Sequence, residues 1–114
     1  MADTWSDRFE NELVNAGKAR RSDNEGRARV CARRAAGIVA EEYFTRQGSS
    51  FQSSSAYEYL KSLHSAPELS DEVKTVVEHF LIRVTLEYDL PINVDLIVEA
   101  RWLAMTLLIN PNSQ

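Results

Sequence analysis

Apolar residues recur at three- and four-residue spacing along most of this chain of 114 residues, which is the period of an α-helix. The clearest stretch runs from Asn24 to Gln47, where small apolar side chains collect on one face. Because most of them are alanine or cysteine, a neighbouring helix can approach closely, and the pattern predicts the central helix of a bundle. This stripe consists of Ala28, Cys31, Ala32, Ala35, Ile38, Val39 and Tyr43.

A first helix of about four turns is predicted upstream of the central one. Asp3 or Thr4 is suited to cap its start, and the polar stretch 20–24 to end it. Downstream of the central helix, Gly48 is suited to a left-handed cap, and the polar segment 49–55 predicts a loop. The inward residues of the first helix are Trp5, Phe9, Leu13 and Ala16.

The second half of the chain predicts one short helix and two longer ones. The short helix ends before Ala66, which precedes a proline. The next helix is capped by Ser70 and ended by Pro91, and the last is capped by Asn93 and ended by Pro111. Their inward residues are, in turn, Ala56, Tyr57, Leu60 and Leu63; Val73, Val76, Val77, Phe80, Leu81, Val84 and Tyr88; and Leu96, Ile97, Ala100, Leu103, Ala104, Leu107 and Leu108.

These elements predict an all-α fold. No run shows the sustained alternation of a β-strand, and the connections are short enough to favour antiparallel neighbours. A chain of this length can also bury a core without disulfides or metals. We therefore expect residues 1–114 to form a single domain, an antiparallel up-and-down four-helix bundle with one additional short helix.

The distribution of charge suggests a docking surface. The net charge of −4 argues against a general attraction for nucleic acid, but residues 18–34 hold seven basic and two acidic side chains. The arginines nearest the stripe are either a solvated flank paired with Glu25 and Glu41, or a surface for an acidic partner or RNA phosphates. Since no aromatic residue interleaves with them for base stacking, a protein partner is preferred to nucleic acid. The candidate partner-binding residues are Arg27, Arg29, Arg33 and Arg34.

A second apolar seam runs along the other side of the central helix. Val30, Gly37 and Phe44 are seven residues apart, and Ala40 lies between them. Such a seam is covered either by the first helix or by the same helix of a second chain. Because glycine costs stability on an exposed helix surface but permits close approach in a seam, the pattern favours a two-fold homodimer.

A family resemblance is carried by GRARVCARRAAGIVAEEYF (residues 26–44) and LSDEVKTVVEHFLIRVTLEYDLPINVDLIVEARWLAMTLL (69–108). From Phe9 to Leu108 the chain resembles the HEPN superfamily of small helical bundles. The resemblance implies an up-and-down bundle, usually a homodimer, often encoded beside a nucleotidyltransferase partner.

The nuclease pattern of that family is incomplete here. Its nuclease members carry an arginine followed at a short distance by a histidine. Arg83 is suitably placed, but Tyr88, Asp89 and Leu90 stand where the histidine is expected. Since neither tyrosine nor aspartate ordinarily transfers protons near neutral pH, we do not carry the ribonuclease chemistry over.

Other candidate chemistry is sparse. His64 and His79 have no cysteine or second histidine at metal-ligand spacing. The acidic residues around Pro91 indicate a solvated rim, because no Glu-x-x-His pair joins them. The single Cys31 cannot form an internal disulfide and reads as a small buried hydrophobe. We expect no catalytic residue, metal or cofactor.

The ends of the chain and its apolar runs predict a cytoplasmic protein without a membrane segment. The N-terminus is polar and acidic, unlike a signal peptide, and the apolar run 102–109 is far shorter than the ~20 residues that span a bilayer. Taken together, the sequence predicts a non-catalytic HEPN-like module that self-assembles and binds a partner. The alternative is a HEPN-like ribonuclease or nucleic-acid-binding protein with a divergent active site.

Overall fold

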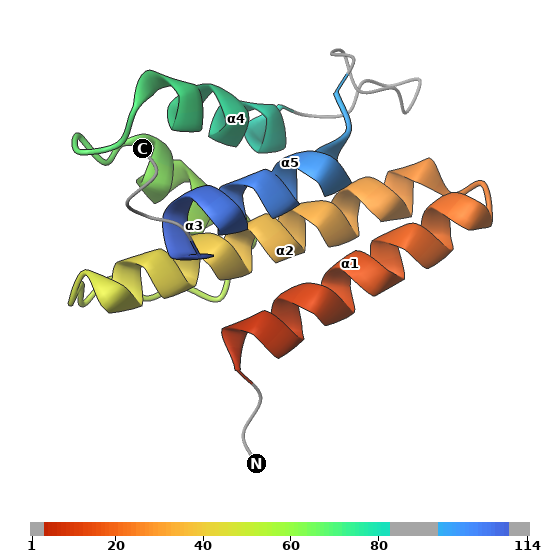
Figure 1. The fold of residues 1–114 in the computed structure, drawn as a ribbon, viewed down its shortest axis with the longest axis horizontal. Coiled ribbons are helices and arrows are strands. Elements are labelled where there is room, and N and C mark those ends of the chain that lie inside the picture. Colours follow the sequence, from red (N-terminus) through yellow and green to blue (C-terminus); the bar gives the residue numbers. More distant parts are fainter. Residues whose placement is uncertain (1–3, 83–93, 110–114) are drawn as a thin grey trace.

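A computed structural model describes residues 4–82 and 94–109 of the protein. In these two ranges, five α-helices and one π-helical turn follow one another (Figure 1). No strand occurs in the described residues, so the predicted all-α bundle is confirmed. The elements are α1 (Trp5–Arg21), α2 (Glu25–Arg46), α3 (Ala56–His64), α4 (Asp71–Leu81), α5 (Leu96–Ala104) and η1 (Met105–Ile109).

Helices α1 and α2 form an antiparallel hairpin. As predicted, Thr4 caps α1: its hydroxyl accepts the Asp7 N–H at 3.1 Å, while the Asp7 carboxylate accepts the Thr4 N–H at 3.3 Å. Asn24 caps α2 by accepting the Arg27 N–H at 3.1 Å. The turn between the helices includes Asp23 at a φ of 58°. These local signals place both helix starts where the sequence indicates them.

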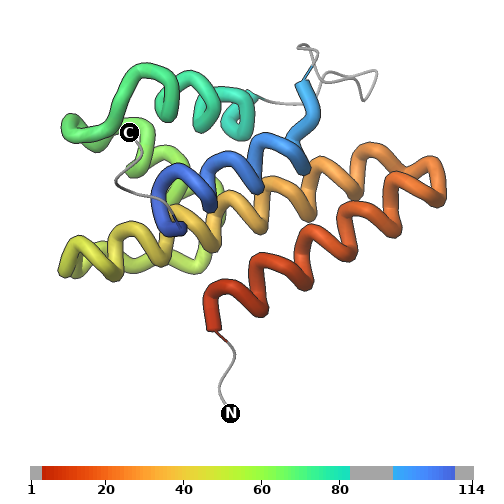
Figure 2. The backbone as a smooth tube through the Cα atoms, viewed as in Figure 1, coloured from red at the N-terminus to blue at the C-terminus, as the bar shows by residue number. Residues whose placement is uncertain are grey.

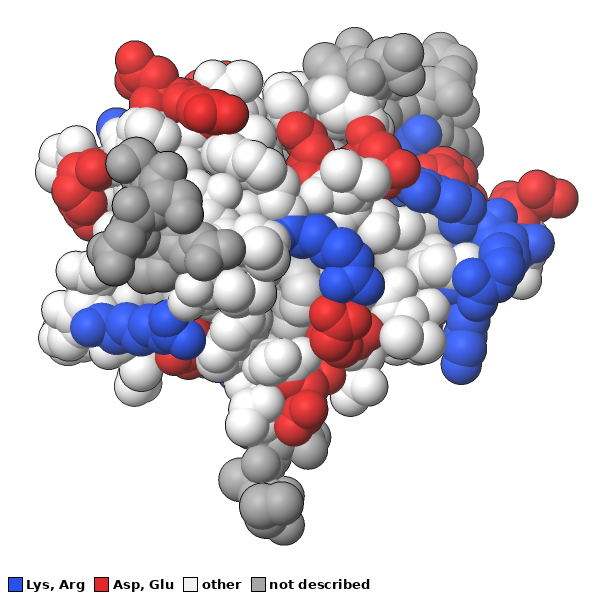
Figure 3. All heavy atoms as spheres, in the orientation of Figure 1, with Lys and Arg blue, Asp and Glu red and all other residues white. Residues whose placement is uncertain are grey.

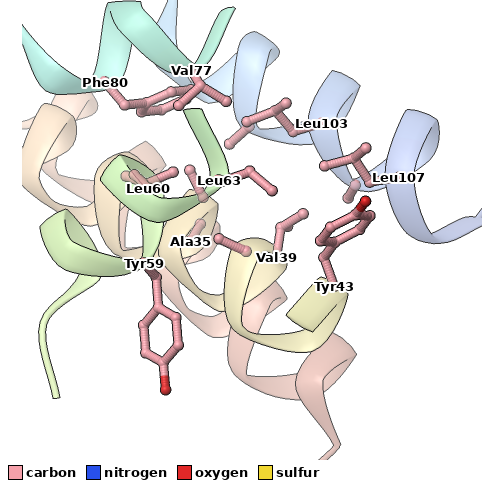
Figure 4. Close-up of a cluster of buried hydrophobic side chains, with 14 of the residues drawn as sticks. Ala35, Val39, Tyr43, Tyr59, Leu60, Leu63, Val77, Phe80, Leu103 and Leu107 are labelled. Carbon is pink, nitrogen blue, oxygen red and sulfur yellow. The ribbon is translucent and has the colours of Figure 1, made fainter. Parts of the chain in front are cut away.

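Helix α2 is the centre of the molecule. Helices α1 and α4 lie on opposite sides of α2 and α5 (Figure 2). Side chains from α3, α4 and α5, among them Leu63, Phe80 and Leu103, converge on Ala35 and Val39 of α2 (Figure 4). The predicted stripe is buried throughout except for Ile38, which is half-buried. Small side chains on α2 therefore let larger ones from three other helices fill the core.

Helix α4 is shorter than predicted. Ser70 caps it as expected, accepting the Val73 N–H at 3.2 Å, but the helix ends at Leu81 and Ile82 is extended, with φ −72° and ψ 130°. The predicted continuation past this point is thus wrong for Ile82; Val84, Tyr88 and Pro91 lie outside the described residues. At this end of α4 the carbonyl groups of Phe80 and Ile82 accept hydrogen bonds from Arg33 of α2.

The last helix begins two residues later than predicted. Asp95 is the cap, because its carboxylate accepts the N–H groups of Ile97 at 3.0 Å and Val98 at 3.3 Å. The predicted cap, Asn93, lies outside the described residues. After Ala104 the helix widens into η1, where the Leu108 carbonyl accepts a hydrogen bond from Arg46 at 2.9 Å.

The glycine predicted to end the central helix has the expected conformation. Gly48 has the predicted left-handed conformation, with a φ of 73°. None of the described helices combines the length and the apolar character needed to cross a membrane.

Candidate partner-binding site

A groove of about 540 Å³ lies along α2, between α1 and the start of α3. Its apolar part comes from Val30, Gly37 and Ile38 of α2 and from Ala56 and Tyr59 of α3. Its polar part consists of Arg8, Glu12, Arg33, Arg34, Glu41 and the serines 53–55. The groove is therefore amphipathic and draws on segments far apart in the sequence.

Close packing at Gly37 forms one wall of the groove. A Cβ atom on Gly37 would lie 2.5 Å from the Ala56 Cβ and 2.8 Å from its Cα. Real Cβ atoms do not approach so closely, so only glycine permits α3 to begin directly against α2 at this position.

The loop after α2 is held by aromatic contacts. Phe51 packs on Phe44 and on Tyr59, with ring centroids 5.8 Å and 5.3 Å away. The Ser53 N–H also donates to the Tyr59 hydroxyl at 3.0 Å, and this hydroxyl points away from the core cluster (Figure 4). A second hollow of about 460 Å³ lies against this loop and shares Glu41, Ser53 and Tyr59 with the groove.

In the part of the chain that the structure describes, some arginines along the groove pair with a carboxylate and others do not. Arg8 pairs with Glu41 at 3.3 Å. Arg33 donates to the carbonyl oxygens of Phe80 at 2.8 Å and Ile82 at 3.4 Å, and burial lowers the pKa of its guanidinium. Within residues 4–82 and 94–109, neither Arg33 nor the exposed Arg34 pairs with a carboxylate. Positive charge therefore concentrates at the Val30 end.

The structure separates the four arginines predicted to bind a partner. Arg33 is half-buried against α4, and Arg29 is half-buried and already engaged in an interaction. Arg27 and Arg34 are exposed, and no partner for either guanidinium occurs in the described part of the chain. They are seven residues apart, so they project from the same side of α2. Two of the four predicted residues are thus available to a ligand.

The two carboxylates predicted to pair with these four arginines pair with arginines of α1 instead. Glu25 accepts two hydrogen bonds from Arg20, at 3.0 and 2.9 Å, and Glu41 pairs with Arg8. Arg20 also pairs with Asp95 at 3.0 Å. Basic side chains gather around the α1–α2 turn (Figure 3), and through Arg20 this end of the molecule joins α1, α2 and α5.

The predicted second seam needs correction. Gly37 and Ala40 are buried within the chain, and Phe44 is half-buried against Phe51; of the four seam residues only Val30 is exposed, at 40%. Ala56 at the start of α3 covers Gly37, and Phe51 of the preceding loop packs on Phe44. Ala40 belongs to the same core cluster as Phe9 and Leu13 of α1. A sequence signal did exist, since Phe51 is the only large apolar residue in that loop.

The other candidate groups lie apart from the groove. His64 pairs with Glu78 at 2.8 Å, and His79 with Glu99 at 2.6 Å. Cys31 is buried, as predicted. Among the described side chains, no three potential metal ligands are grouped together.

Comparisons with protein-family models, curated proteins and solved structures gave no match. The HEPN resemblance therefore stays a prediction from the sequence. Arg83 and the residues expected to complete a nuclease pattern, Tyr88, Asp89 and Leu90, lie outside the described residues.

Proposed function

We propose that this chain is a non-catalytic helical module that binds a protein partner in the groove between α1, α2 and the start of α3. This proposal rests on the surface at one end of the groove, which Val30 and Arg34 line. There an aliphatic side chain that is 40% exposed adjoins Arg34, which has no carboxylate partner among the described residues. Arginine beside exposed apolar surface is typical of protein contact sites.

The side chains of the groove support binding more than catalysis. Its described lining holds arginine, glutamate and tyrosine as ionisable groups. General acid–base chemistry at neutral pH usually relies on histidine, and the two described histidines pair with glutamates of α4 and α5 instead. Of the two groove glutamates, Glu41 is already paired with Arg8.

The alternative function is a HEPN-like ribonuclease or nucleic-acid-binding protein, and it rests on the family resemblance alone. A homodimer and a nucleotidyltransferase partner come from the same resemblance and stay proposals. Because Ala56 covers Gly37 and Ala40 is buried, we infer that self-association would use a surface other than these two residues.

Selection from a random peptide library displayed on phage tests the proposed function. The intact protein is the bait, and a Ser54→Trp variant fills the groove without changing its charge. Ser50→Trp is the matched control, because Ser50 is exposed in the same loop but lines neither hollow. We expect selected peptides to bind the parent and Ser50→Trp but not Ser54→Trp. Failure to select any peptide, or equal binding to all three proteins, would contradict the proposal.

A further inference from the structure

We propose that the groove receives an extended acidic segment of the partner, with one carboxylate facing Arg34 of the groove lining and an apolar side chain resting on Val30. A second carboxylate faces Arg27, which is exposed one turn of α2 before Val30 and does not line the groove itself. This inference rests on the proposed function and names its ligand class. It concerns the one stretch of α2 where exposed basic and apolar side chains alternate on the same side.

Helical geometry sets the spacing of the two charges. Arg27 and Arg34 are separated by seven residues, which is about 10 Å along the helix axis at 1.5 Å per residue. An extended polyproline II segment rises about 3.1 Å per residue and repeats its facing every three residues, so acidic residues three positions apart face the same way at about 9 Å. Such a segment presents both carboxylates to the arginines, while its two intervening side chains lean to either side. Val30 lies to one side of the line through Arg27 and Arg34 on α2, so one of these intervening side chains can rest on it.

Arg33 strengthens the preference for an anion. Its guanidinium lines the groove but is held by two carbonyl oxygens of α4, so its charge is fixed in position. Burial lowers the pKa of this group, because water solvates the charged form less well. A partly desolvated charge acts on a neighbouring anion more strongly than an exposed one does.

The groove suits an acidic peptide better than RNA. Glu12 and Glu41 lie along the same groove and would repel a continuous phosphate backbone. A peptide can place uncharged residues beside them and opposite the serines 53–55. Base stacking would need an exposed aromatic ring, and the groove's only aromatic residue, Tyr59, is 7% exposed.

The composition and affinity of the selected peptides test this inference. We expect an excess of Asp and Glu three positions apart. In fluorescence polarisation with a labelled selected peptide, Arg34→Glu and Arg27→Glu should each weaken binding roughly tenfold. Arg21→Glu makes the same charge change at an exposed site at the end of α1, away from the α2 positions of the proposed contact, and it should change affinity less than about twofold. Circular dichroism of each variant checks that it is folded.

Two results would overturn the inference, and they differ from failure of the proposed function. Peptides that Ser54→Trp blocks, but that lack acidic residues and tolerate Arg34→Glu, would leave the groove a docking site for another chemistry. Binding of a labelled oligouridylate that is lost in both Ser54→Trp and Arg34→Glu, with no competition by the peptides, would assign the groove to nucleic acid instead.

Discussion

Arg33 and Arg34 are adjacent in the sequence but lie in different environments. Arg33 is half-buried and satisfies two carbonyl groups at the end of α4, whereas Arg34 is exposed. Both were candidates for partner binding on the same grounds, namely charge and position beside the stripe. The difference between them depends on α4, which is some fifty residues away in the sequence and could not be placed against α2 from local patterns.

Replacement of each arginine by methionine tests this difference. Arg33→Met leaves the carbonyls of Phe80 and Ile82 without their donor, so we expect the free energy of unfolding to fall by about 1–3 kcal/mol. Arg34→Met should change it by less than about 0.5 kcal/mol. Urea unfolding followed by circular dichroism measures both values. Equal stability of the two variants would show that the Arg33 hydrogen bonds do not hold α4.

Gly37 is a second residue whose role depends on a distant segment. Because Ala56 lies where its Cβ would stand, we expect Gly37→Ala to lower the free energy of unfolding by about 1–3 kcal/mol. Gly17→Ala is the matched control, since a Cβ there meets only the end of the Arg21 side chain, at 3.4 Å. That variant should gain about 0.5–1 kcal/mol from better helix propensity. A gain at both glycines in thermal unfolding would contradict the close α2–α3 packing.

An ion pair between Asp95 and Arg20 links the start of α5 to the end of α1. Burial by itself would raise the pKa of Asp95, but the hydrogen bond from Arg20 and those from the N–H groups of Val98 and Ile97 outweigh it, and the pKa lies below its ordinary value of 3.8. A carboxyl group with a depressed pKa stabilises the fold above its unfolded pKa. This contribution is lost as the pH falls through the folded pKa.

Asp95→Asn tests this linkage because asparagine can still cap the helix but carries no charge. We expect the parent protein to be more stable than the variant by about 1 kcal/mol at pH 7, and the difference to shrink below pH 3.8, the ordinary value for Asp95. Urea unfolding of both proteins at pH 7 and pH 3 gives the comparison. A difference that stays constant with pH would mean that the Arg20–Asp95 charge pair contributes nothing.

Most of the predicted seam is buried within the molecule and is not available to a second chain. Val30 is the one seam residue with a substantially exposed side chain. Because the other seam residues are covered within the chain, we do not expect the seam to join two chains. Val30→Asp should therefore leave the mass measured by light scattering at micromolar concentration unchanged, whether the parent is a monomer or a dimer. A dimeric parent that becomes monomeric on this substitution would show that the seam does join two chains.

Local patterns along the chain predict the helices, most of their ends and the all-α class. Caps such as Thr4 and Ser70, and the small-residue stripe of α2, act within one or two turns, so their effect can be read locally. At Ile82, where the chain departs from prediction, the carbonyl accepts a hydrogen bond from Arg33 of another helix, a contact that local patterns do not show.

Contacts between segments far apart in the sequence determine which of the predicted site residues can meet a ligand. The second seam of α2 is closed by Ala56 and Phe51, and the groove exists because α1 and the start of α3 flank the same face of α2. Helical periodicity shows which residues share a face, but it carries no information on which distant segment covers that face. That choice follows from the packing of the whole chain around α2.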